Sequence, residues 1–223
     1  MEATSKHMQH SAVIFDLDGT LLDTLADIGN SANETLVAEG FSPHELDAYR
    51  RFIGDGIETL FTRALPPAAV SDAVVADCVR RYRGVYVRRW NDQARPYDGI
   101  EALLAELAQR GVSMAVLSNK SHPFTVRCVE HFFPQTQFAC VYGQRSGVPI
   151  KPHPAGALEI LQHLQRSPGE VVYVGDTSTD MQTAVAAKLF PVGVLWGFRE
   201  REELLQCGAQ AIVAHPCELL TYF

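Results

Sequence analysis

The amino-acid sequence predicts an α/β protein: a Rossmann-like, doubly wound parallel sheet with a small α-helical domain inserted into it. Two observations predict this fold class. From about residue 96 onward, short apolar runs alternate with amphipathic helical stretches, which is the pattern of βαβ units. Between residues 24 and 95 the pattern is helical throughout, without a convincing strand. We therefore expect a core of residues 11–23 and 96–223 and a helical insertion, or cap, of residues 24–95.

The N-terminal segment, residues 1–10, is expected to be a tail outside the core. It is polar and lacks the apolar stretch of a signal peptide. The pair His7-Met8 is consistent with a vector-derived origin, so we leave this segment out of the fold prediction.

The first expected element of the core is a buried strand, the apolar run Ala12–Phe15. It ends at two carboxylates, Asp16 and Asp18, and the turn Gly19-Thr20 follows. Ligands bind at the carboxyl ends of strands in open α/β sheets. Isolated buried carboxylates are costly and basic residues are scarce in this stretch, so the pair needs an outside partner, for which a divalent cation is the leading candidate.

The inserted segment is expected to contain four helices. The first runs from an N-cap at Thr24 to about Ala38. Ser42-Pro43-His44-Glu45 then has the pattern of a capping box with proline at the first helical position, and predicts a helix that ends near Ile53. After the loop Gly54-Asp55-Gly56, helices are expected at residues 57–65 and 71–90. The chain passes between the core and the inserted segment at Asp23-Thr24 and at Arg95-Pro96, and these two connections are expected to be hinges.

The rest of the chain supplies the other strands and helices of the core. Right-handed crossovers between parallel strands place the helices on both faces of the sheet. The expected strands are residues 112–117, 138–142, 171–174, 191–195 and 211–213. The expected helices are residues 100–110, 121–133, 154–165, 178–188, 200–207 and 217–222.

The composition argues against several classes of function. The 223 residues are 47% hydrophobic, enough for a sizeable core, and carry a formal net charge of -7. The acidic balance argues against nucleic acid or a membrane surface as a partner, and no apolar run approaches the roughly 20 residues of a membrane span. Five scattered cysteines without a C-x-x-C spacing indicate reduced thiols in a cytoplasmic protein.

Three further polar clusters follow expected strands. They are Ser118-Asn119-Lys120, Lys151-Pro152-His153-Pro154 and the segment from Gly175-Asp176 to Asp180. Each alone has an ordinary explanation: a helix cap, a solvated lysine, or a carboxylate at a helix N-terminus. Together with Asp16 and Asp18 they occupy the carboxyl ends of neighbouring strands, and so predict one polar site on a single rim of the sheet.

These clusters carry a resemblance to a known family. Asp16-Leu17-Asp18-Gly19-Thr20 resembles the first motif of the haloacid dehalogenase-like hydrolase superfamily, and Ser118, Lys151 and Gly175-Asp176…Asp180 match its second, third and fourth motifs in order. The inserted helices resemble that superfamily's small cap. Three further segments resemble the phosphoglycolate phosphatase subfamily: Phe52-Ile53-Gly54-Asp55-Gly56, Ile150-Lys151-Pro152-His153-Pro154 and Val194-Leu195-Trp196-Gly197-Phe198.

The resemblance implies a Mg²⁺-dependent phosphatase that works through an aspartyl-phosphate. Asp16 would be the nucleophile, Asp18 the general acid and base, and Lys151 the cation that offsets the developing negative charge. The Mg²⁺ ligands would be Asp16, Asp176 and the backbone carbonyl of Asp18. Asp180 would orient Lys151 or hold the water shell of the metal. The substrate-binding residues would be Thr20, Ser118, Asn119, Gly54, Asp55 and Gly56.

The residue types exclude some of the possible reactions but say less about which substrate is used. An alkoxide leaving group needs a proton and a halide does not, so Asp18 favours phosphate-ester hydrolysis over dehalogenation. A phosphonate hydrolase of this family would need a lysine in the cap, and residues 24–95 contain none. The small-molecule substrate is expected to be 2-phosphoglycolate. The alternatives are another sugar phosphate, pyrophosphate, a phosphomutase reaction, or phosphate binding without turnover.

Substrate selection is expected to depend on the cap. Arg50, Arg51 or Arg63 would pair with a substrate carboxylate, the alternative being a solvated helix face. The Gly54–Gly56 loop would bring backbone close to a small ligand, the alternative being a plain turn between helices. The sequence leaves open whether the protein is a monomer or a homodimer.

Overall fold

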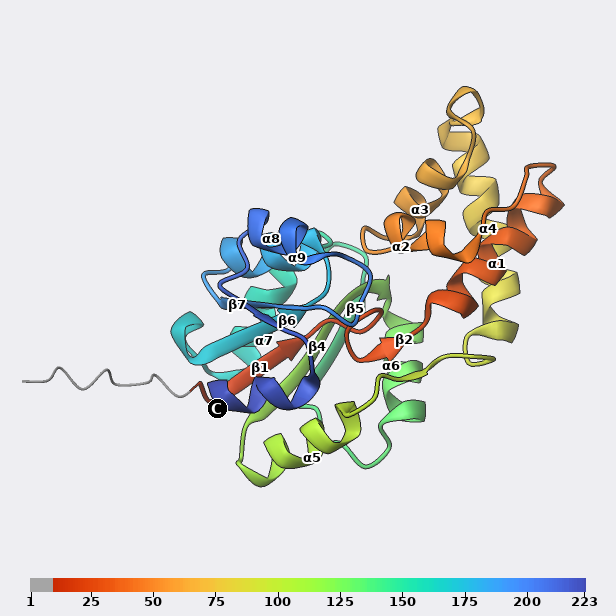
Figure 1. Ribbon diagram of the computed structural model, residues 1–223. Helices are drawn as coiled ribbons and strands as arrows, with labels where there is room; N and C mark the ends of the chain where they lie inside the picture. The colour runs from red at the N-terminus through yellow and green to blue at the C-terminus, as the bar shows by residue number, and fades with distance from the viewer. Residues whose placement is uncertain (1–9) are drawn as a thin grey trace, which may run out of the picture.

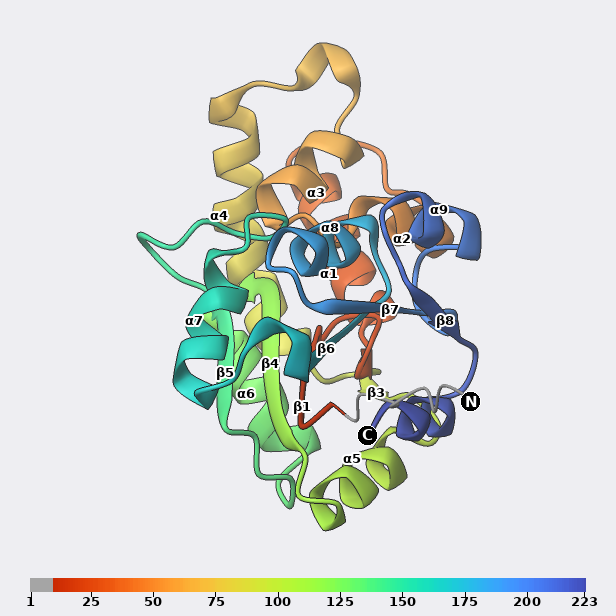
Figure 2. The ribbon, with the colours of Figure 1, turned by 90° about the vertical axis from the view of Figure 1, so that its left-hand side faces the viewer.

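The computed structural model describes residues 10–223 (Figure 1). Its core is a six-stranded sheet in the order β5-β4-β1-β6-β7-β8, and every neighbouring pair is parallel. Figure 2 shows the strands in this order. The strands are β1 (Ala12–Phe15), β4 (Ser113–Ser121), β5 (Cys140–Gln144), β6 (Val171–Gly175), β7 (Phe190–Val194) and β8 (Ala211–Val213). The sheet confirms the predicted α/β fold class.

Helices cover both faces of this sheet. They are α5 (Ile100–Gln109), α6 (His122–Phe132), α7 (Ala155–Leu164), α8 (Ser178–Ala186) and α9 (Arg201–Gln206). Alternate residues of β1 point to opposite faces. Val13 and Phe15 belong to one apolar cluster with residues of α5 and α6, whereas Ala12 and Ile14 belong to another with residues of α7 and α8. The fully buried β1 is therefore the centre of a three-layer core.

The inserted helices lie apart from the sheet, beyond the carboxyl ends of its strands (Figure 1). They are α1 (Leu25–Ala38), α2 (Tyr49–Phe52), α3 (Ile57–Ala64) and α4 (Asp72–Arg89). A two-stranded antiparallel ribbon joins them to the core. In it β2 (Leu22–Asp23) pairs with β3 (Arg95–Pro96), so that Asp23 lies opposite Arg95. This ribbon is absent from the sequence prediction, because strands of two residues leave no periodic pattern.

The predicted capping box at Ser42-Pro43-His44-Glu45 is wrong. The chain has no regular structure from residue 41 to residue 45, and a 3-10 turn, Leu46–Ala48, leads into the short helix α2. The reason is a tertiary contact. The side chain of Asn33 accepts a hydrogen bond from the His44 backbone N–H and donates one to the His44 carbonyl, each at 2.8 Å. These bonds hold the backbone of His44 outside a helix.

Several other element boundaries differ from the prediction by one or two residues, and two elements differ by more. Strand β4 does not end at residue 117 but continues to Ser121, with a shift in its pairing register to β5 between Leu117 and Ser121. The last expected helix is instead a 3-10 segment, Pro216–Tyr222. The predicted tail, apart from His10, lies outside the described residues.

Two expectations from composition can be compared with the structure. All five cysteines are free. Among residues 10–223, none of the helices combines the length and the apolar character that crossing a membrane requires.

Candidate active site

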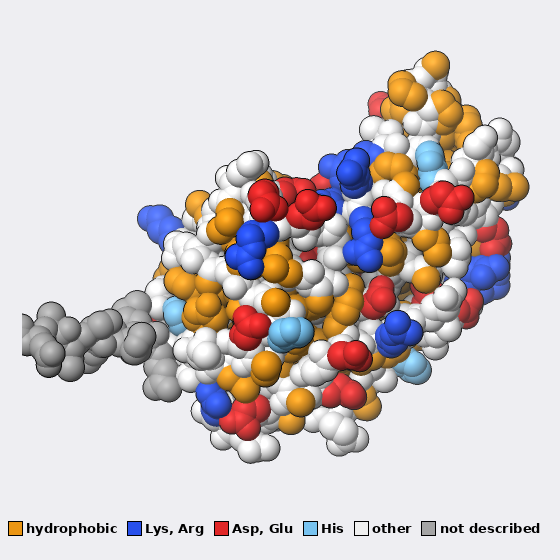
Figure 3. Space-filling model, in the orientation of Figure 1, with side chains coloured by type: hydrophobic (Ala, Val, Ile, Leu, Met, Phe, Trp, Pro, Cys, Tyr) orange, Lys and Arg blue, Asp and Glu red, His pale blue; other side chains and the backbone are white. Residues whose placement is uncertain are grey.

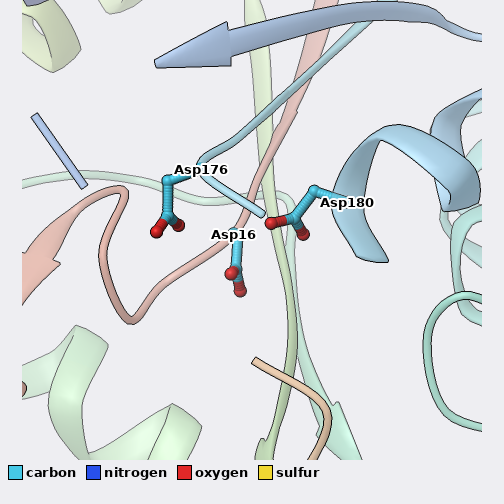
Figure 4. A group of neighbouring side chains, drawn as sticks. All are labelled: Asp16, Asp176 and Asp180. Carbon is cyan, nitrogen blue, oxygen red and sulfur yellow. The ribbon is translucent and has the colours of Figure 1, made fainter. Parts of the chain in front are cut away.

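Three carboxylates meet at the carboxyl ends of the central strands. Asp16 follows β1, Asp176 follows β6, and Asp180 lies in the first turn of α8 (Figure 4). Their oxygen atoms come within 4.8 Å of one another. Asp176 and Asp180 are fully buried and Asp16 is 4% exposed. The predicted convergence of these strand ends on one rim is therefore present in the fold.

Lys151 is the cation of this cluster. Its Nζ atom lies 2.9 Å from Asp16 Oδ1 and 2.7 Å from Asp180 Oδ1, and it also donates to the Leu117 carbonyl. Burial disfavours the charged ammonium, but the two carboxylates outweigh this effect and raise the pKa of Lys151 well above its usual value. Burial, followed by the charge of Asp180, raises the pKa of Asp16 well above its usual value.

Asp176 is held by groups from two other segments. Thr20 donates its hydroxyl to Oδ1 at 2.8 Å, and the Phe198 backbone N–H donates to Oδ2 at 2.9 Å. Burial and then the charge of Asp180 raise the pKa of Asp176 to about 7. Gly19, at φ +88°, and Gly197 pack so closely on this carboxyl that a Cβ atom at either position would overlap it. The site therefore requires glycine in both turns.

Asp180 has its oxygens occupied by protein groups. Oδ2 accepts from the Thr177 hydroxyl at 2.6 Å and from the Thr177 backbone N–H at 3.1 Å, a reciprocal cap at the start of α8. Oδ1 accepts from Lys151 and, at 3.2 Å, from the Tyr173 hydroxyl. Asp180 thus contacts Lys151 directly, as one of the two roles predicted for it requires.

Asn119 links the core to the cap loop. Its side-chain amide donates to the carbonyl oxygens of Gly54 and Lys151, both at 3.0 Å, and accepts from the Lys151 backbone N–H at 2.9 Å. Neighbouring Ser118 is buried, and its hydroxyl accepts from the Lys120 backbone N–H at 3.2 Å. Both predicted substrate-binding residues line the cavity described below.

Asp18 has a partner that the sequence analysis missed. Lys120 Nζ donates to both oxygens of this carboxylate, at 2.7 and 2.9 Å. The Thr24 hydroxyl donates to Oδ1 at 2.8 Å, so Thr24 precedes α1 as predicted but its side chain does not cap the helix. The sequence signal for Lys120 is its position directly after Ser118-Asn119, in the same polar cluster.

A cavity of about 370 Å³ opens between the rim of the sheet and the inserted helices. Asp16, Asp18 and Ser118 line its core side. Much of the remaining wall is apolar or aromatic and includes Ile28, Ile53, Ile57, Leu60, Tyr82, Tyr86, Pro123 and Phe124. Gly54 and Gly56 line the cavity as predicted, whereas Asp55 lies outside its lining and binds Thr179 and, at 2.5 Å, Arg63.

The cap loop is held against the core from the other side by Arg199. The guanidinium of Arg199 donates to the carbonyl of Arg50 and, at 2.9 Å, to that of Ile53. Arg50 in turn donates to the Gly197 carbonyl at 2.9 Å. Charged side chains of both signs gather where the inserted helices meet the core (Figure 3). Arg50 and Arg63, expected to face a substrate carboxylate, are therefore engaged in contacts outside the cavity.

The carboxylate oxygens at the carboxyl ends of the strands are suitable ligands for a hard divalent cation. Asp16, Asp176 and Asp180 bring three carboxylates into one buried cluster, and Lys151 balances one of their charges. Oxygen-only ligands with an excess of negative charge are what Mg²⁺ prefers in proteins. The chemistry of the residues present therefore fits the predicted metal.

Comparisons with known proteins agree with this architecture. The family model for haloacid dehalogenase-like hydrolases matches residues 13–194. Phosphoglycolate phosphatase of Xylella fastidiosa strain 9a5c is 32% identical over 194 residues, which are 86% of this chain and 82% of that protein. Phosphoglycolate phosphatase of Pseudomonas putida is 30% identical over 190 residues, 83% of this chain and 70% of that one.

A comparison with solved structures finds the same fold in a protein of this family. A haloacid dehalogenase-like family hydrolase from Streptococcus pneumoniae superposes with a TM-score of 0.86 at 26% identity, over 96% of this chain and 99% of that one. The family match covers Asp16, Ser118, Lys151 and Asp176. The chain belongs to the haloacid dehalogenase-like hydrolase family.

Proposed function

We propose that this hydrolase is a Mg²⁺-dependent phosphatase that cleaves a small phosphate monoester through an aspartyl-phosphate on Asp16. The observation that carries the proposal is the pairing of Asp16 and Asp18 at one side of the cavity, each with its own lysine. A nucleophile and an acid that face the same space are what a two-step phosphoryl transfer requires.

In the first step, an Asp16 oxygen attacks phosphorus while the bond from phosphorus to the ester oxygen breaks. Asp18 gives its proton to the leaving alkoxide, which departs as an alcohol. In the second step, Asp18 takes a proton from water as the water oxygen attacks the same phosphorus. The bond to Asp16 then breaks, and inorganic phosphate leaves. Lys151 and Ser118 would hold the phosphoryl oxygens, with the lysine offsetting the negative charge that collects on them.

Asp16, Asp176 and the backbone carbonyl of Asp18 would hold the Mg²⁺ ion. When bound, the ion supplies positive charge that neutralises the repulsion between the Asp16 carboxylate and the phosphoryl oxygens. Thr20 and Phe198, which bind Asp176, would act by orienting that ligand. Asp180 would act through Lys151 rather than as a metal ligand, because each of its oxygens already accepts two hydrogen bonds from the protein. Among residues 10–223, each oxygen of Asp176 accepts only one and keeps a lone pair for the ion.

Residues 24–95 would act as the cap that closes the site and excludes bulk water. The Gly54–Gly56 loop contributes to the cavity wall, which supports a role for this segment in substrate selection. A phosphomutase remains the alternative for the same core, since it differs in passing the phosphoryl group to a second hydroxyl rather than to water.

The first substrate to test is 2-phosphoglycolate. The support is the name of the relatives that match this chain at about 30% identity, together with the acid at Asp18, which suits an alcohol leaving group. Small sugar phosphates and pyrophosphate are the alternatives. The cavity of about 370 Å³ is large enough for any of these.

A turnover screen tests the proposal directly. The 223-residue protein with Mg²⁺ is expected to release phosphate from small phosphate esters including 2-phosphoglycolate, and EDTA is expected to abolish the release. Asp16→Asn is expected to be inactive while remaining folded, because the amide has the shape of the carboxyl without its nucleophilic charge. Wild-type turnover by this variant would refute the covalent mechanism, and phosphate binding without turnover would refute the enzymatic one.

A further inference from the structure

The carboxylate of Asp18 is held by one donor from the core and one from the inserted segment. Lys120 Nζ donates to Oδ1 at 2.7 Å and to Oδ2 at 2.9 Å, and the Thr24 hydroxyl donates to Oδ1 at 2.8 Å. Each carboxylate oxygen has about two acceptor sites, so within the described part of the chain Oδ1 is filled and Oδ2 keeps one site for a further group. Asp18 can therefore exchange a proton with a bound molecule while Lys120 remains in contact with it.

The backbone of Lys120 is itself fixed on both sides. Its N–H donates to the Ser118 hydroxyl at 3.2 Å, and its carbonyl accepts from the Thr125 hydroxyl at 3.1 Å. A Cβ atom at Gly143 would lie only 2.5 Å from the Lys120 carbonyl oxygen, so β5 packs directly against this part of β4. The lysine side chain therefore starts from a backbone whose position is defined.

The ammonium group of Lys120 is buried and has contacts from both parts of the molecule. Its side chain is 7% exposed, and Nζ is 5.0 Å from the centre of the Tyr86 ring, within the range at which a cation is attracted to an aromatic face. Tyr86 belongs to α4. The ion pair of Lys120 is with Asp18, whereas Lys151 pairs with Asp16. The two buried lysines thus serve different carboxyl groups.

We propose that Lys120 is a positioning residue for Asp18, which it holds in the orientation from which a proton reaches the ester oxygen. The inference rests on the proposed phosphatase function. In the first step the O–H bond of Asp18 breaks and the proton goes to the ester oxygen as that oxygen leaves phosphorus. In the second step a proton from water returns to Asp18. Both transfers need hydrogen-bond reach, and a misplacement of about 1 Å can cost about 10²-fold in rate.

Two other roles for Lys120 lead to different kinetics. A lysine that bound the phosphoryl group would promote phosphoryl transfer from every ester. A lysine that only joined α4 to the core would support the fold, and its loss would also slow all esters alike. A lysine that positions the acid matters only where the leaving oxygen needs a proton. The dependence of the rate on the leaving group therefore separates the three roles.

The test compares two esters on the 223-residue protein with Mg²⁺. They are p-nitrophenyl phosphate, whose leaving group needs no proton, and ethyl phosphate, whose leaving group does. The ethyl group carries no polar atom, so a lost contact to it cannot imitate the effect. The measured quantity is the ratio of kcat/KM for the aryl ester to kcat/KM for the alkyl ester. A misfolded fraction cancels from this ratio, because the same molecules hydrolyse both esters.

Lys120→Met is expected to raise the ratio at least about tenfold, because the alkyl ester loses up to about 10²-fold while the aryl ester changes little. Lys120→Arg should restore most of the wild-type ratio, since a guanidinium can also donate to both oxygens of a carboxylate. Lys188→Met is the matched control, because it removes an exposed lysine, and its ratio should equal that of the wild type.

A ratio unaltered in Lys120→Met would overturn the inference and leave the phosphatase function intact. Hydrolysis of the aryl ester alone by the wild type would also overturn it, because the site would then contain no working acid for Lys120 to position. Hydrolysis of neither ester by the wild type would instead refute the proposed function.

Discussion

The ammonium nitrogen of Lys151 lies 2.9 Å from the Asp16 carboxylate, and the two side chains are only 3% and 6% exposed. The same nitrogen lies 2.7 Å from Asp180. Lys151 is therefore placed to compensate charge at the nucleophile, and its own position is fixed from the opposite side. The Coulomb attraction between two charges is stronger in such a buried site than at the protein surface.

Replacing Lys151 by methionine is expected to lower kcat by about 10² to 10³-fold, because phosphoryl transfer loses its nearest cation. The variant should also lose about 3 kcal/mol of stability, since a buried ion pair is broken on one side only. Phosphate-release kinetics and thermal melting measure the two effects. Lys188→Met removes an exposed lysine and is the control. A Lys151→Met enzyme with wild-type kcat would show that the lysine has a structural role alone.

The metal-free protein is expected to become less stable as the pH rises from about 4 to about 7. Burial, with the charge of Asp180, raises the pKa of Asp176 from 3.8 to about 7. The folded state thus binds this proton more tightly than the unfolded state, so the contribution to stability is present at low pH and is lost as the pH passes through the folded-state pKa. Asp16 acts in the same direction, because its pKa is raised as well.

Thermal melting in EDTA across this pH range measures the effect. Asp176→Asn should flatten the pH dependence, because the amide does not titrate. Added Mg²⁺ should raise the melting temperature of the wild type at pH 7 and above but have little effect on Asp176→Asn, since the cation binds the deprotonated carboxylates. An identical pH profile for the wild type and Asp176→Asn would contradict the assignment.

The strand ends explain why much of the site could be predicted from the sequence. Asp16, Ser118 and Asp176 each follow an apolar run, and the parallel order of the sheet brings the ends of those runs to one rim. Their proximity follows from local pattern and topology alone. Lys151 comes from a loop, and its place in the site was implied by the resemblance to the family rather than by periodicity.

The remaining contacts depend on tertiary geometry that has no local signature. Lys120 reaches Asp18 because β4 continues past its apolar run, with a shift of register that no apolar pattern marks. Arg199 binds the carbonyl of Ile53, 146 positions away in the sequence. The failed capping box has the same cause, since the side chain of Asn33 outweighs a helix signal that is local to residues 42–45.

Arg199 is expected to hold the cap loop in place. Its side chain is 10% exposed, and its guanidinium binds the carbonyl oxygens at the end of α2, directly before the glycines that line the cavity. Arg199→Ala should lower kcat/KM by about fivefold to tenfold, mainly through a higher KM, because the cavity wall loses its support. Hydrogen exchange of residues 53–57 should become faster in the variant. The control is Arg201→Ala, which removes an exposed arginine of α9. If Arg199→Ala changed neither the hydrogen exchange of this loop nor KM, the loop would be held in place without Arg199.

The acid and base roles of Asp18 can be separated by the choice of leaving group. An alkyl phosphate needs a proton on its leaving oxygen, so Asp18→Asn should lower its hydrolysis by about 10² to 10⁴-fold. Nitrophenolate leaves without a proton, so the same variant should still transfer the phosphoryl group of p-nitrophenyl phosphate to Asp16. The second step then stalls, because water activation also needs Asp18. Rapid mixing should therefore show a burst of about one nitrophenolate per site followed by slow turnover, whereas steady hydrolysis of alkyl phosphates by Asp18→Asn would exclude Asp18 as the acid.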